Sequence, residues 1–324
     1  MSVPVSKKLA IGIDIGGTNS VFGFVDHRGN ISYRGAISTK KYKDINEYLT
    51  ALAEAVEPLI EQVGGKEYIQ GVGIGAPNGN YYNGAIEYAP NLPWKGFIPL
   101  ADLIQNKLGL PSALTNDANA AAVGEMTYGS AIGMKHFIMI TLGTGVGSGI
   151  VIDGKVVYGH DGFAGELGHT ITIPGGRKHW STGAEGSLET YASATGVRLT
   201  ALEFLDKFPD KHSLLRNYNP EDIDSKVIYD CAIQGDELAN NVFDYTGKIL
   251  GLALANFVMF SSPEAVVLFG GLMKAGDLII KPTKETMEKN LLPIFQNKVK
   301  LLKSELKESD AAILGASALV WELK

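Results

Sequence analysis

Two stretches of the sequence place a turn rich in glycine and threonine between two apolar runs. The first, IGIDIGGTNSVFGFVDHRGNI, covers Ile11–Ile31, and the second, ITLGTGVGSGIVIDGKVV, covers Ile140–Val157. A turn without Cβ atoms lets backbone N–H groups approach a ligand in a row, and threonine hydroxyls add further donors. Phosphate oxygens suit such donors, so we expect both turns to bind nucleotide phosphates. The residues concerned are Gly16, Gly17, Thr18, Thr141, Gly143, Thr144, Gly145 and Gly147.

Neither turn matches the better-known phosphate motifs. Both lack the Gly-Lys-Ser/Thr of a Walker loop, and GTGVGSG is followed by a strand pattern where a Rossmann fingerprint requires a helix. Each turn alone is also consistent with an ordinary hairpin that has glycine at positive φ. The motif occurs twice, however, and Asp14 directly precedes the first turn. This favours two hairpins that face each other across a cleft and bind one polyphosphate from both sides.

The elements that must position these turns follow from hydrophobic spacing and turn signals. Strand patterns alternate with helical patterns, which predicts an α/β fold with mixed sheets. Asp44 and Ser309 are suitable N-caps for the helices that follow them. The expected helices include 45–63, 100–108, 237–260 and 309–323, the expected strands include 68–77, 111–115 and 137–142, and 163–195 is expected to be mainly loop.

Composition limits the class of protein. A chain of 324 residues suggests two domains, and a net charge of −6 disfavours a nucleic-acid-binding surface. Cys231 is the only cysteine, so a disulfide within the chain and a cysteine metal cluster are both excluded. The N-terminus lacks the apolar run of a signal peptide, and no uninterrupted apolar stretch reaches about 18 residues. These features predict a soluble cytoplasmic protein that binds neither nucleic acid nor membrane.

A set of motifs resembles one known family. GIDIGGTN, GAP, NLPW, NDANAAAVGE, TLGTGVGSGIVIDG, GFAGELGH and LFGG occur in this order over nearly the whole chain. Together they resemble the ROK family of sugar kinases, of the bacterial glucokinase type. The resemblance implies a two-domain actin-like ATPase/hexokinase (ribonuclease H-like) fold, with mixed sheets flanked by helices. We expect an N-terminal domain of residues 1–117, joined by 309–324, and a larger domain of residues 118–308.

The resemblance also implies a role for each motif residue. Asp117 is expected to be the general base that takes the proton of a sugar 6-hydroxyl, although such a residue also suits a helix N-cap. Asp14 is expected to orient Mg²⁺ through water, or else only to shape its turn. Gly270 and Gly271 follow a strand and are expected to pass against the adenosine of ATP. The expected sugar ligands are Asn91, Asn116, Glu166, His169 and Glu189.

One motif departs from the family. Many members have three cysteines after the Gly-His, and these bind a structural zinc together with the histidine. Here the stretch is HWSTGAEGSLE, which places Trp180, Thr182 and Ser187 at the cysteine positions. A zinc site needs about four nitrogen or sulfur ligands, so we predict no structural zinc. A packed Trp180 and hydrogen bonds from the hydroxyls are expected to replace it and to leave His169 free to face the sugar. Asn78, where glucokinases often have Gly, is a mild change because Asn tolerates left-handed backbone.

The predicted function is phosphoryl transfer from ATP to the 6-hydroxyl of D-glucose. N-acetylmannosamine, N-acetylglucosamine or fructose is the alternative acceptor, and residues 79–88 and 162–189 are expected to discriminate among them. A sugar-responsive ROK repressor is the alternative from another class. We disfavour it because only about eight residues precede the first strand, which leaves no room for a helix-turn-helix. A homodimer or a higher homo-oligomer is expected.

Overall fold

The computed structural model describes residues 8–321, and they form two compact units. Of the described residues, unit 1 contains 8–134, the segment Gly149–Gly165, and 305–321. Unit 2 contains Lys135–Ser148 and Glu166–Ser304. Compact units need not be independent domains, so the domain boundaries expected from the sequence, 1–117 with 309–324 and 118–308, stay a prediction.

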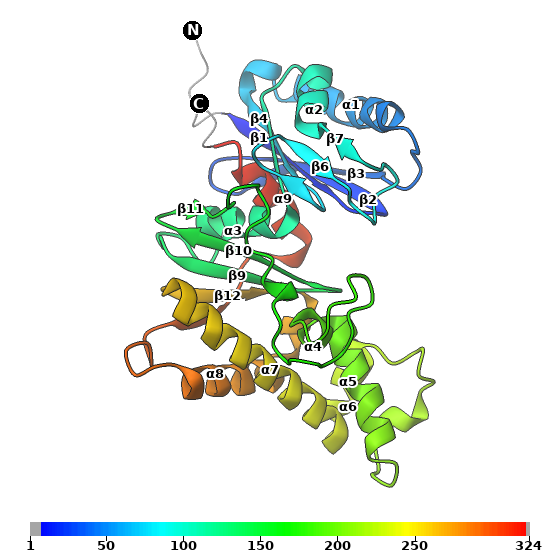
Figure 1. Ribbon diagram of the computed structural model, residues 1–324. Coiled ribbons are helices and arrows are strands. Elements are labelled where there is room, and N and C mark those ends of the chain that lie inside the picture. Colours follow the sequence, from blue (N-terminus) through cyan, green and yellow to red (C-terminus); the bar gives the residue numbers. More distant parts are fainter. Residues whose placement is uncertain (1–7, 322–324) are drawn as a thin grey trace. The chain divides into compact units, whose positions relative to one another are not determined.

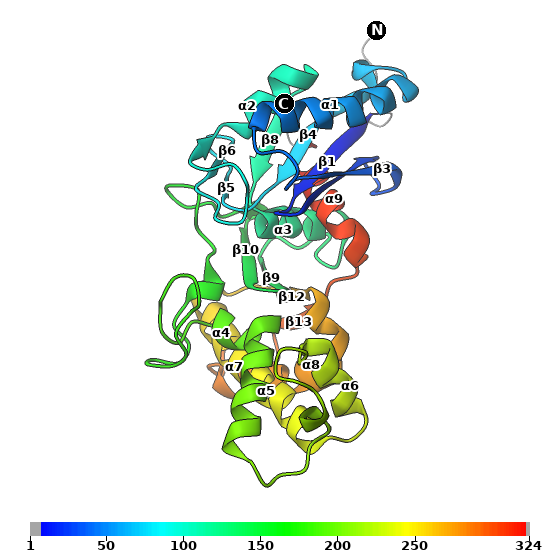
Figure 2. The same ribbon diagram turned by 90° about the vertical axis from the view of Figure 1, so that its right-hand side faces the viewer.

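Unit 1 is built on a five-stranded sheet with the order β3-β2-β1-β4-β8 (Figures 1 and 2). β1 pairs antiparallel with β2 and parallel with β4, and β4 pairs parallel with β8. The carboxyl ends of the parallel strands therefore meet at one edge. The strands are β1 (Leu9–Ile15), β2 (Asn19–Val25), β3 (Ile31–Ser38), β4 (Ile69–Gly75) and β8 (Ser112–Thr115).

The first strand uses its two faces differently. Ile11, Ile13 and Ile15 alternate with Gly12 and Asp14, as the period of two in a strand requires. The isoleucines belong to a core that also contains side chains of α1 (Ile45–Gln62) and α2 (Leu100–Leu108). A fully buried isoleucine side chain contributes roughly 1.5–3 kcal/mol by leaving water. The alternation therefore fixes Asp14 on the opposite face of the sheet.

That opposite face is covered by α3 (Asp117–Tyr128) and α9 (Glu308–Ala318), as Figure 2 shows. Gly12 pairs with Gly73 on β4, and the bare backbone there lets α9 approach closely. A Cβ atom at Gly12 would lie 2.1 Å from the carbonyl oxygen of Ile313, and one at Gly73 would lie 1.9 Å from that of Ala316. These glycines thus determine where the C-terminal helix docks on unit 1.

A small three-stranded sheet completes unit 1. It consists of β5 (Gly79–Asn80), β6 (Ala85–Glu87) and β7 (Phe97–Ile98), and a short η2 turn (Lys66–Tyr68) precedes β4. The loop before β7 is anchored by Trp94, whose indole N–H donates to the Tyr42 carbonyl oxygen at 3.2 Å and whose ring lies 4.5 Å from that of Tyr48. This anchor fixes the NLPW segment.

Unit 2 contains most of a second five-stranded sheet, with the order β11-β10-β9-β12-β13. The strands are β9 (Phe137–Leu142), β10 (Val146–Ile152), β11 (Lys155–Val156), β12 (Ala265–Phe269) and β13 (Lys300–Lys303). From Gly149 onward β10, and with it β11, belongs to unit 1. The helices are α4 (Glu189–Ala192), α5 (Ala194–Lys207), α6 (Ser225–Ile233), α7 (Glu237–Ser261) and α8 (Asp277–Asn290), with short turns η3 (Leu167–His169), η4 (Leu214–Asn217) and η5 (Gly271–Ala275).

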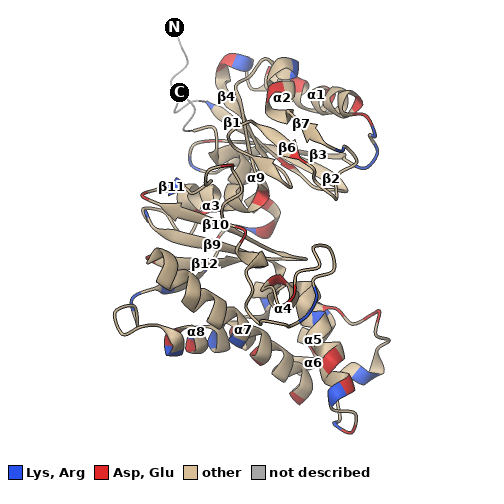
Figure 3. Ribbon diagram, viewed as in Figure 1, with Lys and Arg blue, Asp and Glu red and all other residues tan. Residues whose placement is uncertain are grey.

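The central helix of unit 2 is α7, which packs along α8. By length and composition alone α7 could cross a membrane, but 67% of its most apolar window is buried inside the protein, as in a core helix. Figure 3 shows Lys and Arg interspersed with Asp and Glu along α5, α6 and α8. The C-terminal half of α7, by contrast, has no charged residue.

The structure confirms several elements and corrects one cap. Leu100–Leu108 and Phe137–Leu142 have the predicted bounds, and the Asp44 side chain accepts from the N–H groups of Asn46 and Glu47 at the start of α1. The prediction that Ser309 caps the last helix is wrong. α9 begins at Glu308 after Lys307, which makes no side-chain cap bond, and the Ser309 hydroxyl donates to Asp310.

Candidate functional site

The first glycine turn, in unit 1, leaves two donors unused. The N–H of Gly16 donates to the carbonyl oxygen of Asn19 at 3.0 Å and so closes the turn. The carbonyl oxygen of Thr18 accepts from the N–H of Lys40. Within residues 8–321, the N–H groups of Gly17 and Thr18 donate to no protein acceptor. Both residues are accessible, so these donors can reach a phosphate.

The segment that contains Asn91 lies against this turn. A Cβ atom at Gly17 would be 2.6 Å from the carbonyl oxygen of Asn91, so only glycine permits this approach. Leu92 and Trp94 are buried and fix the segment, whereas Asn91 is exposed. The predicted sugar ligand Asn91 is therefore a direct neighbour of the predicted phosphate donors.

Two carboxylates meet where β1, β4 and β8 end. Asp14 pairs with Gly75, and Gly75 pairs with Thr115, two residues before Asp117. A Cβ atom at Gly75 would lie 3.6 Å from Asp14 Oδ1 and 3.9 Å from the Cα atom of Asp117. Gly75 thus forms a bare floor between Asp14 and Asp117, and register alone brings together two residues about 100 positions apart in sequence.

The electrostatics of this pair favour protonation or a cation. Burial raises the pKa of Asp14 to about 6, and the negative charge of Asp117 adds to the rise. Burial also raises the pKa of Asp117, although hydrogen bonds from backbone N–H groups, including that of Ala118 at 2.8 Å, oppose the rise. Asp117 nevertheless keeps an exposed surface, so a ligand can reach its carboxylate.

Asn116, and not Asp117, caps the helix. The Asn116 side-chain oxygen accepts from the N–H of Asn119 at 2.7 Å, and Asp117 is the first residue of α3. Asp117 therefore does not cap α3, and its carboxylate remains available for chemistry. The oxygen of the Asn116 amide is engaged in capping, which leaves its NH₂ group as the part that can contact a ligand.

The second glycine turn, in unit 2, repeats the bonding pattern of the first. The N–H of Gly143 donates to the carbonyl oxygen of Gly145 at 3.0 Å, and the N–H of Gly147 donates to Thr141 Oγ1 at 3.1 Å. In the part of the chain that is described, the N–H groups of Thr144 and Gly145 have no protein acceptor. Thr141 and Gly147 thus brace the hairpin, while Thr144 and Gly145 offer two donors, as Gly17 and Thr18 do.

Glu189 holds this second turn. Its Oε2 accepts from the N–H of Val146 at 2.7 Å, and its Oε1 lies 2.6 Å from Nε2 of His179. A Cβ atom at Gly145 would lie 2.4 Å from Oε2, so glycine is required here as well. Glu189 was predicted as a sugar ligand; the structure gives both of its oxygens protein partners, and its side chain is 13% exposed.

Glu166 and His169 lie together on the loop before α4. The short η3 turn brings His169 Nε2 to 3.9 Å from Glu166 Oε2, so the two side chains converge. The His169 ring is 5.3 Å from that of His179. Their side chains are 38% and 56% exposed for His169 and Glu166, so both are accessible to a ligand.

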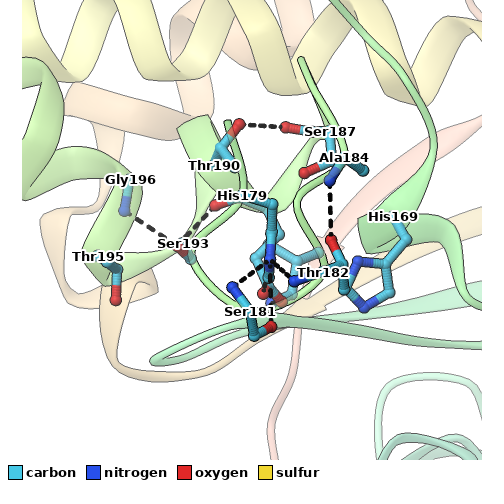
Figure 4. A network of polar contacts seen from close by, with 12 residues as sticks. His169, His179, Ser181, Thr182, Ala184, Ser187, Thr190, Ser193, Thr195 and Gly196 are labelled. Carbon is cyan, nitrogen blue, oxygen red and sulfur yellow. Dashed lines mark hydrogen bonds and ion pairs between the residues drawn. The ribbon is translucent and has the colours of Figure 1, made fainter. Parts of the chain in front are cut away.

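The loop without cysteines is organised by His179 (Figure 4). Nδ1 of this buried ring lies 3.2 Å from the N–H nitrogens of Ser181 and Thr182. The expectation of a packed Trp180 and bonding hydroxyls is only partly right. Trp180 stacks on His179 but is 49% exposed, and the buried Ser187 hydroxyl has no hydrogen-bond partner among residues 8–321.

Arg177 supplies a second anchor for the same loop. Its guanidinium binds both carboxylate oxygens of Glu203 on α5 at 2.6 Å and donates to the carbonyl oxygens of Thr190 and Gly196. Among residues 8–321, no cluster of three or more His, Cys, Asp or Glu side chains is placed to bind a metal ion. That the protein contains no zinc stays a prediction.

The predicted adenosine loop borders a cavity in unit 2. Gly270 has a φ of 113°, and a Cβ atom there would lie 2.4 Å from the carbonyl oxygen of Leu142, directly before the second glycine turn. Gly271 lines a cavity of about 400 Å³, which is large enough for a small ligand. The other lining residues are Ser225, Lys226, Tyr229, Asp230, Phe243, Leu272, Lys274 and Ala275.

Sequence reasoning missed three of these residues: His179, Arg177 and Gly75. His179 lies in an irregular loop and carries no periodic signal. Arg177 lies in a loop, and the hydrogen-bond partners of its side chain are 13 to 26 residues away in the sequence. Gly75 could have been found, since a glycine that ends a buried strand often marks close approach of another group. The expectation for Asn78 is confirmed: it adopts a left-handed conformation with φ of 51°.

Comparison with known proteins identifies the family. The model of the ROK family matches residues 10–322. A glucokinase of Halalkalibacterium halodurans is 35% identical over 98% of this chain and 96% of its own length, and one of Thermotoga maritima is 34% identical over 98% of both. The crystal structure of a ROK family glucokinase from Streptomyces griseus, in complex with glucose and AMPPNP, aligns with a TM-score of 0.77 and 32% identity over 96% of this chain and 98% of that one. The fold is thus the mixed α/β, actin-like fold of ROK sugar kinases, and the chain belongs to the ROK family.

Proposed function

We propose that this protein is an ATP-dependent glucokinase that transfers the γ-phosphoryl group of ATP to the 6-hydroxyl of D-glucose. The meeting of Asp14 and Asp117 at Gly75, beside a turn with free N–H donors, is the observation that carries the proposal. Family membership, and relatives named glucokinase over almost their full length, support the same reaction.

Asp117 accepts the proton of the 6-hydroxyl in this proposal. A carboxylate whose pKa is raised is a stronger base than an ordinary one, and it remains ionised at a pH above that pKa. Its position at the start of α3 leaves the carboxylate exposed to a substrate. The hydroxyl oxygen then attacks the γ-phosphorus, and ADP leaves.

The phosphate donors come from the two turns. The N–H pairs of Gly17–Thr18 and Thr144–Gly145 are suited to phosphate oxygens because glycine lets the backbone approach them. Adenosine occupies the cavity beside Gly271. The two similar glycine turns in the sequence predict that both bind a single triphosphate.

Asp14 is the residue that would hold Mg²⁺. The structure gives its carboxylate a raised pKa and no hydrogen-bond donor among residues 8–321, which is the environment that a cation relieves. Mg²⁺ usually keeps several waters and uses one or two carboxylates, so Asp14 suits it directly or through water. When bound, the ion would offset negative charge on the phosphates.

The sugar ligands proposed are Asn91 and Asn116 in unit 1 and Glu166, His169 and Glu189 in unit 2. Amide, carboxylate and imidazole groups bond hydroxyls as donors or acceptors. Glu189 keeps further lone pairs beside those used by Val146 and His179. These ligands serve several hexoses, so fructose and the N-acetyl sugars are separated from glucose only by assay.

A coupled ADP-release assay over glucose, fructose, N-acetylglucosamine and N-acetylmannosamine tests the proposal. We expect the highest kcat/KM with glucose, and glucose 6-phosphate as the product. Asp117→Asn serves as the control for background ATP hydrolysis. Turnover of an N-acetyl sugar without turnover of glucose would support a sugar kinase but contradict the assignment as a glucokinase. If no sugar were phosphorylated, both the sugar-kinase and the glucokinase assignments would be contradicted.

Location and assembly also stay proposals. We expect a cytoplasmic homodimer or a higher homo-oligomer, as is usual in the family. Light scattering coupled to size-exclusion chromatography measures the mass in solution, and a mass of about 35 kDa, which is that of one chain, would contradict an oligomer.

A further inference from the structure

We propose that His179 is a positioning residue for phosphoryl transfer, and that its neutral imidazole sets the second glycine turn through Glu189. The proposal rests on the proposed kinase function and assigns a part to a residue that touches neither phosphates nor sugar in that scheme. Figure 4 shows His179 beside Ser181 and Thr182 on the loop before α4. Its further partners lie in α4 and at the start of β10, and all of them belong to unit 2.

The hydrogen bonds of His179 define where its proton lies. Nδ1 faces the backbone N–H groups of Ser181 and Thr182, each at 3.2 Å, and an N–H group can only donate. Nδ1 must therefore be the acceptor and carries no proton. The ring is then neutral with its proton on Nε2, and Nε2 donates to Oε1 of Glu189 at 2.6 Å.

The chain of bonds continues from Glu189 into the turn. Its second oxygen, Oε2, accepts from the N–H of Val146 at 2.7 Å, directly after the donors Thr144 and Gly145. The loop N–H groups thus fix His179, His179 fixes one oxygen of Glu189, and the other oxygen fixes the turn. Because both oxygens are held, the carboxylate cannot rotate without breaking one of the two bonds.

Burial makes this connection stiff. The His179 side chain is 1% exposed and that of Glu189 is 13% exposed, and the indole of Trp180 stacks on the imidazole with ring centroids 4.4 Å apart. Hydrogen bonds to a charged acceptor are strong where water is excluded. Arg177 anchors the same loop to α5 independently, so the loop stays in place when the His179 bond alone is removed.

The consequence concerns the free donors of the turn. Without the His179 bond, Glu189 retains one partner in a mostly buried site and can turn away from Val146. The N–H groups of Thr144 and Gly145 then lose their fixed direction, and a misplacement of about 1 Å in a phosphate site can cost on the order of 10²-fold in rate. The loss should therefore fall on steps that use ATP.

Two substitutions separate the two sides of the ring. His179→Gln places an amide NH₂ near the position of Nε2, where it can still donate to Glu189. His179→Asn places its amide oxygen near the position of Nδ1, where it can accept from Ser181 and Thr182, but it cannot reach Glu189. We expect His179→Gln to keep kcat/KM for ATP within about 5-fold, and His179→Asn to lower it by about 30–100-fold. The melting temperature of His179→Asn should stay close to that of His179→Gln.

A double-mutant cycle with Glu189→Gln gives the second readout. If His179 acts through Glu189, His179→Asn adds little in the Glu189→Gln background. His212→Asn, at an exposed histidine of the same unit, is the control and should match the unmodified protein. Additive effects in the cycle, equal activity of the Gln and Asn variants, or losses that only follow melting temperature would each overturn the proposal.

Binding of ATP, measured by calorimetry without sugar, separates this proposal from the proposed function. The weaker ATP binding of His179→Asn relative to His179→Gln is expected whichever sugar is phosphorylated. If no sugar is phosphorylated but this difference remains, the glucokinase proposal fails and the role of His179 stands. If glucose is phosphorylated and ATP affinity and kcat are the same in both variants, the opposite holds.

Discussion

The two glycine turns are alike in their own bonding but differ in what supports them. Each closes on itself and leaves two adjacent N–H groups without an acceptor among residues 8–321. The first is supported by backbone: the carbonyl of Asn91 against Gly17, and Lys40 bonded to Thr18. The second is supported by side chains and helix ends: Glu189 on Val146, and the N–H of Ala194 on the carbonyl of Gly143. The same donor geometry is thus reached by two kinds of support.

The difference extends to the nearest carboxylate. Asp14, beside the first turn, has no hydrogen-bond donor within the described residues. Burial raises its pKa, and the negative charge of Asp117 adds to the rise. Glu189, beside the second turn, has donors on both oxygens. An unsatisfied carboxylate suits a role that involves a cation, whereas a satisfied one suits a structural role. Motif residues of similar type are therefore held in different environments.

The largest effect on activity is expected at Asp117, the proposed base, which lies in unit 1 with the first turn. Asp117→Asn removes the proposed base and should lower kcat by at least about 10²–10³-fold, since general base catalysis contributes roughly 10²–10⁴-fold. The KM values should change little. Steady-state kinetics with glucose measure this, with circular dichroism as the check on folding. Retention of full activity would contradict the base assignment.

A Cβ atom added to each turn compares the two kinds of support directly. Gly17→Ala meets the rigid carbonyl of Asn91 at 2.6 Å, and Gly145→Ala meets the Glu189 carboxylate at 2.4 Å. We expect both to lower kcat/KM for ATP by about 10–100-fold, because the free donors must shift. Gly143→Ala, with nothing within 4 Å of the added atom, is the matched control and should stay within about 3-fold. Equal losses in all three would show that turn flexibility, and not support, decides activity.

Asp14 should make stability depend on pH in a defined direction. The folded protein binds its proton below a pKa of about 6, whereas the unfolded chain releases it near 3.8. The contribution of Asp14 to the free energy of unfolding is therefore fully present below about pH 4 and is lost as the pH rises through about 6, by at most about 3 kcal/mol. Asp14→Asn should remove this fall, so its free energy of unfolding should exceed that of the unmodified protein at pH 8 and approach it at pH 4.

Urea denaturation at pH 4, 6 and 8 without Mg²⁺ measures the difference. Glu189→Gln is a useful counterpart. The Glu189 carboxylate accepts hydrogen bonds from two donors, Val146 and His179, so its replacement should destabilise the protein at neutral pH. If Asp14→Asn followed the same pH curve as the unmodified protein, the assigned raised pKa would be wrong.

The smallest effect is expected at Trp180, in the support of the second turn. Trp180→Ala removes the stacking of the indole on His179, but the Trp180 side chain is already about half exposed. We therefore expect the free energy of unfolding to fall by about 0.5–1.5 kcal/mol. Thermal denaturation gives the value. Metal analysis of the same preparations tests the absence of zinc: one equivalent of tightly bound zinc would contradict that prediction.

Much of the fold followed from local pattern. Leu100–Leu108 and the Asp44 cap were predictable because apolar spacing and capping chemistry act within a few residues. The cap at Ser309 failed for the opposite reason, since Ser and Asp side chains compete for nearby partners and Ser309 bonds Asp310.

The sequence by itself determined the family, the two donor turns and the identity of the candidate base, because each is written in contiguous residues. The tertiary structure decided what those residues contact. Strand register brought Asp14 to Asp117 across Gly75, and loop packing gave Glu189 to His179 and Val146. Partners of this kind lie far apart in the chain, and no periodicity or motif specifies which distant groups a fold brings within hydrogen-bonding distance.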